Sequence, residues 1–244
     1  MAANEQFDWR QDDRRVYAVA AIMFLVIVFI GFARTYYLKF AFTTPPIPGL
    51  LVHLHGLLMT IWVGYFISQV WLIRSKNARV HMRAGTIGVG LAIAIIVVGF
   101  FTAASAAKFG STSTPGGVPP LSFVAVPLFD LVMFAILFGG AIYYRKRPAN
   151  HKRLMLLTVL NFLPPAIARI PLGPISATGP LFFFGVPTVL AIGFVTYDTW
   201  RNGKLNKIFL AGAILLVISY PLRLILSGTD AWIAFATWVT SWAA

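Results

Sequence analysis

Long apolar segments alternate with short polar connections along almost the whole chain. Seven such segments cover residues 16–33, 50–73, 84–107, 121–144, 154–171, 180–197 and 208–226. A run of about 18 or more apolar residues is long enough to cross the hydrocarbon core of a bilayer as a helix. The pattern therefore predicts an all-α transmembrane bundle of about seven spans, in which residues 1–244 form a single membrane domain.

The two ends of the chain differ from these spans. Residues 1–15 form a polar leader with four acids, and Gly31-Phe32-Ala33 resembles a signal-peptidase site. The first apolar run is nevertheless long for a signal peptide, and the acids ahead of it are atypical, so we expect a retained helix. Residues 231–242 are too short to span, and the spacing of Trp232, Phe235 and Trp238 predicts a helix that lies in the membrane interface.

The distribution of charge supports this organisation and orients it. Only 11% of the 244 residues are charged, against roughly a quarter in soluble domains. The net charge is +13, and 15 of the 20 Lys and Arg residues fall in alternate connections on one side of the predicted bundle. Basic connections mark the cytoplasmic side, so the amino terminus is expected inside. The lipid bilayer is the predicted partner and nucleic acid is not, because no basic stripe carries interleaved aromatics.

Two basic connections resemble each other. When residues 74–83 are shifted by 70 positions onto residues 144–153, Lys, His and Arg match without a gap, and the histidines are His81 and His151. The match is either coincidental or the trace of a parallel repeat of two helical hairpins.

His81 and His151 each lie at the predicted cytoplasmic start of a helix, in the sequence His-x-Arg or His-Lys-Arg. Two imidazoles from different helices are the usual axial ligands of a b-type haem, or form half of a metal site. Gly85 and Gly88 on the face behind His81 would let a flat macrocycle, or a neighbouring helix, approach closely. The alternative interpretation is two interfacial histidines among basic residues that set topology. The absence of cysteine excludes thiolate metal sites and iron–sulfur clusters.

His53 and His55 lie near the predicted outer end of the second span. On a helix they point about 200° apart, so they cannot share one metal ion. His55 shares a face with Trp62 and Gln69, whereas His53 shares a face with Gly56. We expect one of the two histidines at the lipid interface and the other inside the bundle.

Asp130 lies about nine residues into its span, at a depth where a carboxylate needs a partner, a ligand or water. Arg169 and Arg223 each follow 15 charge-free residues, so both are expected several ångströms inside the outer boundary. The alternative is that they extend into the outer headgroups. The sequence predicts a buried polar cluster in the outer half of the bundle, made of His53, His55, Asp130, Asn161, Arg169 and Arg223.

Several of these residues form a pattern that is similar to one in known sequences. The arrangement His53…Gly56…Trp62…Gln69…His81-x-Arg83-x-Gly85, followed by His151-Lys152-Arg153, Pro164-x-x-Ala-x-Arg169 and Pro221-x-Arg223, resembles a group of uncharacterised bacterial predicted membrane proteins. The resemblance implies a multi-pass protein of the bacterial cytoplasmic membrane and implies no activity. There is a looser likeness to cytochrome b-type bundles, whose histidines sit on helices at membrane depth.

Two functions remain open on the sequence. One is an electron-transfer or redox protein that binds haem b through His81 and His151, with a quinone in the outer polar cluster. The other is a transporter, or a lipid- or small-molecule-binding protein, that uses the buried charges of Asp130, Arg169 and Arg223. The sequence predicts no catalytic residue, leaves enzymatic activity undecided and does not predict an oligomeric state.

Overall fold

The described part of the computed structural model comprises residues 2–44, 46–47, 49–109, 117–173 and 178–243, with side chains described from residue 15 onward. This part is helical and contains no strand. The long helices are α1 (Ala2–Phe32), α2 (Leu50–Arg74), α3 (Ala78–Phe109), α5 (Ala125–Tyr143), α6 (Pro148–Asn161), α8 (Pro180–Asn202) and α9 (Lys207–Leu226). The shorter ones are the π-helix η1 (Ala33–Tyr37), the 3-10 helix η2 (Lys39–Ala41), α4 (Pro120–Phe123), α7 (Pro164–Ile167) and α10 (Asp230–Ser241).

Six of these helical segments are long and apolar enough to cross a membrane. They cover Arg15–Tyr37, Leu50–Arg74, Ala78–Phe109, Pro120–Tyr143, Pro180–Asn202 and Lys207–Leu226. Large hydrophobic side chains cover their outward faces, among them Ile93, Val189 and Ile225. Apolar side chains both inside and outside a bundle are typical of helices that contact lipid. The chain is therefore an all-helical, multi-pass membrane protein.

The segment predicted as the fifth span, residues 154–171, is not one continuous helix. α6 ends at Asn161, and α7 covers only Pro164–Ile167. Proline lacks a backbone N–H and its ring clashes with the preceding turn, so Pro164 and Pro165 can open a helix but cannot continue α6. The 14 residues of α6 rise about 21 Å, which is less than a hydrocarbon core of about 30 Å.

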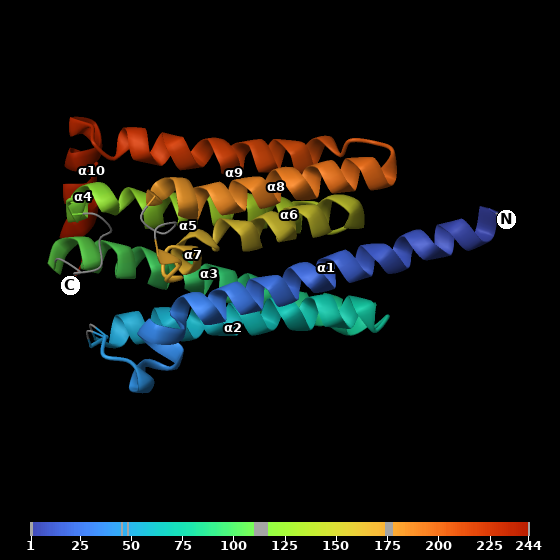
Figure 1. Cartoon of the computed structure of the whole chain (residues 1–244), viewed down its shortest axis with the longest axis horizontal. Helices are drawn as coiled ribbons and strands as arrows, with labels where there is room; N and C mark the ends of the chain where they lie inside the picture. Colours follow the sequence, from blue (N-terminus) through green and yellow to red (C-terminus); the bar gives the residue numbers. More distant parts are fainter. Residues whose placement is uncertain (1, 45, 48, 110–116, 174–177, 244) are drawn as a thin grey trace.

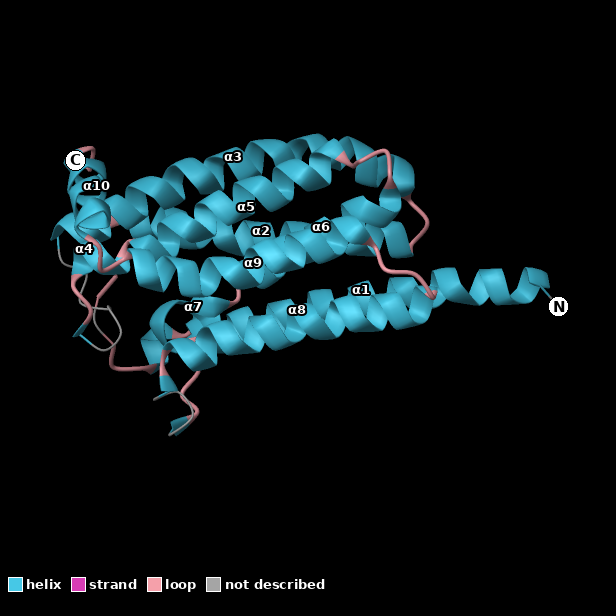
Figure 2. Ribbon diagram, turned by 90° about the horizontal axis from the view of Figure 1, so that it is seen from above, coloured by secondary structure: helices cyan, strands magenta, loops and turns pink. Residues whose placement is uncertain are grey.

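The helices run side by side along the long axis of the molecule (Figure 1). The connections α2–α3, α5–α6 and α8–α9 lie at the end where the chain begins, and α10 lies across the opposite end (Figures 1 and 2). α6 and α7 together return the chain from the first of these ends to the second. The sequence assigns 15 basic residues to one side of the membrane. They lie in or next to helix ends at the amino-terminal end of the bundle (Figure 1).

The main core lies where α1, α2, α5 and α6 meet. Its fully buried side chains include Phe24, Trp62, Phe134 and Leu157. Trp62 makes edge contacts with Phe134 at 5.2 Å and Phe138 at 5.8 Å between ring centroids. These aromatic side chains lie between two groups of polar residues. One group is at the amino-terminal end of the bundle, and the other is nearer α10.

Two helices begin earlier than the apolar pattern predicts. α1 begins at Ala2 instead of residue 16, and α3 begins at Ala78 instead of residue 84. At α3, Asn77 precedes the first turn and its side-chain oxygen accepts a hydrogen bond from the Val80 N–H at 3.4 Å. Polar residues can extend a helix past the hydrocarbon core because its length is set by capping and not by hydropathy. His81 consequently lies within the first turn of α3.

Candidate functional sites: a histidine pair and two buried ion pairs

The structure brings His81 and His151 together. His81 lies at the start of α3 and His151 at the start of α6, and their ring centroids are 6.3 Å apart with an interplanar angle of 77°. Both rings are half-buried. Two residues separated by 70 positions in the chain thus meet between two helices at the amino-terminal end of the bundle.

The two rings differ in their hydrogen bonds. Nδ1 of His151 lies 2.8 Å from the carbonyl oxygen of Ala141, so Nδ1 carries the proton and Nε2 keeps its lone pair in the neutral ring. Nδ1 of His81 is buried and has no hydrogen-bond partner among the described residues. A histidine that binds a metal usually donates its other N–H to a carbonyl or carboxylate, which is the arrangement of His151.

The surroundings of the pair fit a group that needs two protein ligands better than one that needs four. Within the described residues, no cluster of three or more His, Cys, Asp or Glu side chains could hold a metal ion. A Cβ built at Gly85, one turn after His81, would meet no atom within 4 Å, whereas one at Gly88 would lie 2.3 Å from the Tyr65 hydroxyl. The face of α3 next to His81 is therefore open, and the following turn is packed against α2.

A second site, deeper in the bundle, joins α5 and α9 through the ion pair Asp130–Arg223. Arg223 is 0% exposed and Asp130 5% exposed. Nη1 of Arg223 donates to a carboxylate oxygen of Asp130 and to the carbonyl of Val126 at 3.3 Å. Asn161 of α6 donates to the backbone carbonyl of Asp130 at 2.9 Å, and its own side-chain oxygen is buried without a partner.

Two further N–H groups of Arg223 are also engaged. Nε donates to the carbonyl of Ser219 at 3.1 Å, and Nη2 donates to the Ser219 hydroxyl at 3.0 Å. The guanidinium lies 5.2–5.6 Å from the ring centroids of Phe129, Phe184 and Tyr220. Because four of its five N–H groups donate to these protein groups, Arg223 has little donor capacity left for a ligand. The arrangement is that of a helix-joining contact.

The other residues of the predicted cluster lie elsewhere. Arg169 and His53 are exposed and do not belong to a buried cluster. Arg169 follows the short helix α7, where its Nη1 donates to the carbonyl of Pro165 at 2.7 Å and its guanidinium covers the Phe32 ring. His55 is half-buried, with a buried Nδ1 that has no partner. The buried part of the cluster is thus Asp130, Asn161 and Arg223.

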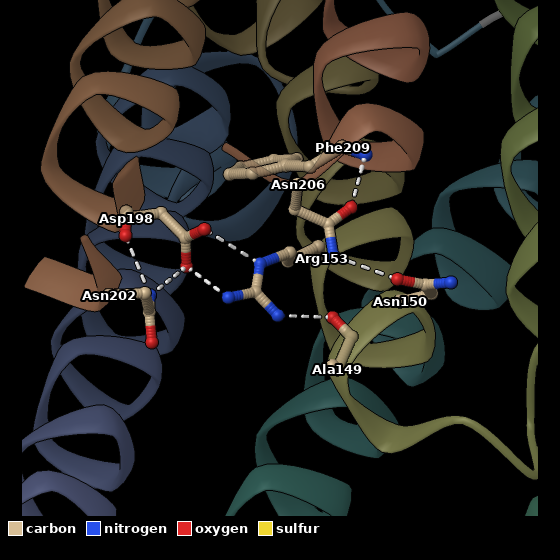
Figure 3. A network of polar contacts seen from close by, with 7 residues as sticks. All are labelled: Ala149, Asn150, Arg153, Asp198, Asn202, Asn206 and Phe209. Atoms are coloured by element: carbon tan, nitrogen blue, oxygen red, sulfur yellow. Dashed lines mark hydrogen bonds and ion pairs between the residues drawn. The ribbon is translucent and has the colours of Figure 1, made fainter. Parts of the chain in front are cut away.

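The sequence analysis missed a second ion pair, Arg153–Asp198, between α6 and α8 (Figure 3). Nη2 of Arg153 lies 2.6 Å from one carboxylate oxygen of Asp198, and Nε donates to the other at 2.8 Å. Asn202 donates to the same carboxylate at 3.2 Å. The charge pattern explains Arg153 as a basic residue that sets topology and predicts no acidic partner for it. A lone acid among basic residues, as Asp198 is in its segment, was the signal for such a pair.

The same network reaches α9. Asn206 donates to the side-chain oxygen of Asn150 at 2.8 Å, and its own oxygen accepts from the Phe209 N–H at 2.9 Å, which caps α9 (Figure 3). A cavity of about 20 Å³ beside Asp198 is lined by side chains of α1, α6, α8 and α9 and is large enough for about one water molecule. These contacts hold α6, α8 and α9 in register at the end where His151 lies.

Comparisons of this chain with protein-family models, with curated proteins and with solved structures found no match.

Proposed function

We propose that this chain is a membrane electron-transfer protein that holds one b-type haem between His81 and His151. The observation that carries the proposal is the approach of these two imidazoles, 6.3 Å between ring centroids, from helices that are not neighbours in sequence. Haem iron takes histidine as an axial ligand, and the bound cofactor would supply one-electron chemistry at its iron.

The spacing of the rings is compatible with one group that both histidines would hold. An imidazole nitrogen binds a first-row metal at about 2.0–2.1 Å, so ring centroids 6.3 Å apart would leave room for one metal ion held by both rings. Within the described residues, no hydrogen bond is made by Nδ1 of His81 or by Nε2 of His151. Either ring nitrogen of histidine can bind a metal.

The proposal favours haem over a bare metal ion because of the number of ligands. A structural zinc ion needs about four ligands from the protein, and a catalytic one about three. Among the described residues, His81 and His151 are the two candidate ligands that meet at this site, whereas a porphyrin brings four nitrogens of its own. The open face at Gly85 is where the edge of a macrocycle could approach the helix backbone.

The proposed membrane arrangement has seven crossings, with the amino terminus and the histidine pair on the cytoplasmic side of a bacterial inner membrane. The basic connections at that end support this orientation. α6 and α7 would form the fifth crossing as a broken helix. Irregular backbone is tolerated at membrane depth when protein surrounds it, and Leu163, Pro164 and Ala166 at the break are buried.

The absorption spectrum of the protein, purified in detergent from cells supplied with a haem precursor, tests the proposal. We expect a low-spin haem spectrum with a Soret band that is lost in His81→Ala and in His151→Ala. His53→Ala is the matched control, since His53 is an exposed histidine, and it should keep the spectrum. A colourless wild-type protein would refute the proposal and leave a transport or small-molecule-binding function to be considered.

A further inference from the structure

The turn between α2 and α3, at the amino-terminal end of the bundle, contains a lysine in a backbone conformation that favours glycine (Figure 1). Among the described residues, Lys76 is the one non-glycine residue with a positive φ, 61°. Its N–H donates to the Ile73 carbonyl at 3.1 Å. The Asn77 N–H donates to the Leu72 carbonyl at 2.8 Å, which completes the Schellman pattern of a helix end. Because Asn77 also caps α3, the turn is short and residue 76 takes the left-handed conformation.

The turn between α8 and α9 meets the same requirement with a glycine. Gly203 follows the last turn of α8 with a φ of 60°. A residue with a Cβ is strained in this conformation, whereas glycine adopts it freely. Residues held in sparsely populated backbone conformations cluster at functional sites. A lysine at position 76 is therefore expected to contribute something other than the turn.

Lys76 belongs to a group of exposed basic side chains that have no acidic partner. Arg74, Lys76, Arg79 and Arg83 lie within ten residues of each other and are all exposed. The sequence contains no acid in residues 14–129, and the carboxylates of the two buried ion pairs are engaged by other arginines. Within the described part of the chain no carboxylate pairs with any of the four. Their mutual repulsion is relieved only by an anion from outside the protein.

Apolar side chains continue from these charges along the helices. Arg79, Arg83 and Ile87 are spaced four residues apart and share one face of α3, and Ile87 is 68% exposed. On α2, Trp71 is 63% exposed and its ring lies 5.8 Å from the Arg74 guanidinium. Tryptophan is enriched at the level of lipid headgroups. Charges followed by an exposed apolar side chain on one helix face match a lipid, with its headgroup and acyl chain, better than an acidic protein.

We propose that the α2–α3 turn binds an anionic phospholipid of the leaflet at this end of the bundle. The phosphate oxygens accept hydrogen bonds from the Lys76 ammonium and from the guanidinium groups of Arg79 and Arg83. An acyl chain lies along the face of α3 that carries Ile87. The site needs this end of the bundle to lie at a membrane surface and does not depend on the haem proposal.

Quenching of Trp71 fluorescence in the full chain, reconstituted into vesicles, tests the inference at the turn itself. Phosphatidylcholine vesicles would contain increasing fractions of brominated phosphatidylglycerol or, in a matched series, of brominated phosphatidylcholine. The Trp71 signal is the difference between the wild type and Trp71→Phe. Half-maximal quenching should need about tenfold less phosphatidylglycerol than phosphatidylcholine, because each basic side chain near the headgroup favours the anionic lipid.

Substitutions separate a lipid site from a turn residue. Lys76→Gly should reduce the preference for phosphatidylglycerol about fivefold, and Arg79→Gln/Arg83→Gln should abolish it. Lys146→Gln is the matched control, since Lys146 is also an exposed lysine in a connection at this end and aligns with Lys76 in the shift of 70 positions. It should keep the preference within about twofold. In sodium dodecyl sulfate, Lys76→Gly should unfold at the same or a higher detergent fraction than the wild type, because glycine relieves the strain.

Three results would overturn the inference. Equal quenching by the two lipids would leave the basic side chains to an acidic protein partner. An equal loss of preference in Lys146→Gln and Lys76→Gly would show a general effect of net charge. Unfolding of Lys76→Gly at a lower detergent fraction would show that the lysine serves the turn. A colourless protein that prefers phosphatidylglycerol at Trp71 would remove the haem proposal and keep this one.

Discussion

Removing the carboxylate of Asp130 should strongly destabilise the bundle. In Asp130→Ala, Nη1 of Arg223 keeps only the Val126 carbonyl at 3.3 Å, while Nε and Nη2 keep their bonds to Ser219. The guanidinium stays fully buried, because Arg223 is 0% exposed and has no route to water. The variant therefore leaves a cation in the core without its counterion.

The loss in unfolding free energy can be estimated from the interactions that Arg223 loses and keeps. Removing one partner of a buried ion pair costs about 3–5 kcal/mol. The three aromatic rings around Arg223 still stabilise its charge by roughly 0.5–2 kcal/mol each, so we expect the lower end, about 3 kcal/mol. Asp130→Asn should cost less, since its amide oxygen still accepts from Nη1. The double variant Asp130→Leu/Arg223→Met should recover most of the loss, because both charges are gone.

The assay is equilibrium unfolding in mixed micelles with increasing sodium dodecyl sulfate, followed by tryptophan fluorescence. Asp230→Ala is the control, because Asp230 is exposed in the first turn of α10 and should contribute about 0.3–1 kcal/mol. The reasoning is refuted if Asp130→Ala is no more destabilising than Asp230→Ala, or if the double variant is less stable than Asp130→Ala.

Three further predictions concern topology and packing. Reporter fusions after Ala78, Ala149 and Gly203 should report the cytoplasm. Fusions after Thr114 and Ser176, which lie outside the described residues, should report the outside. A cytoplasmic signal at Thr114 would contradict the orientation. Gly31→Ala should lower the free energy of unfolding by about 1–3 kcal/mol through its clash with α7, while Gly64→Ala, where a Cβ meets nothing within 4 Å, should not lower it. Trp238 in α10 and Trp242 directly after it are 56% and 57% exposed, so brominated lipids should quench their fluorescence and should leave that of Trp62 unquenched. Equal quenching would mean that the aromatic side of α10 does not face lipid.

The sequence predicted the helical spans well because hydropathy and length together decide whether a helix suits a bilayer. It failed on residues 154–171, where composition alone hides the break between α6 and α7 at Pro164. The same break explains why the partner of Asp130 could not be chosen in advance. Arg169 and Arg223 follow equal apolar runs, but the turn before α7 carries Arg169 to the surface, whereas α9 continues through Arg223.

The histidines show what spacing can and cannot predict. The 200° separation of His53 and His55 on a helix gives one exposed and one half-buried side chain, as α2 has them. The offset of 70 residues aligned His81 with His151 but said nothing of their distance, which depends on how α3 and α6 pack around α5. The pair Arg153–Asp198 was missed because basic residues in connections are normally explained by topology alone.

The haem content of the purified protein tests the central claim most directly. A pyridine haemochrome assay, referred to the protein concentration, should give about one haem b per chain in the wild type and in His53→Ala, as two axial histidines for one iron require. His81→Ala and His151→Ala should each fall to a small fraction of that value while they remain folded by circular dichroism. Wild-type protein without stoichiometric haem, or full occupancy in both histidine variants, would contradict the account.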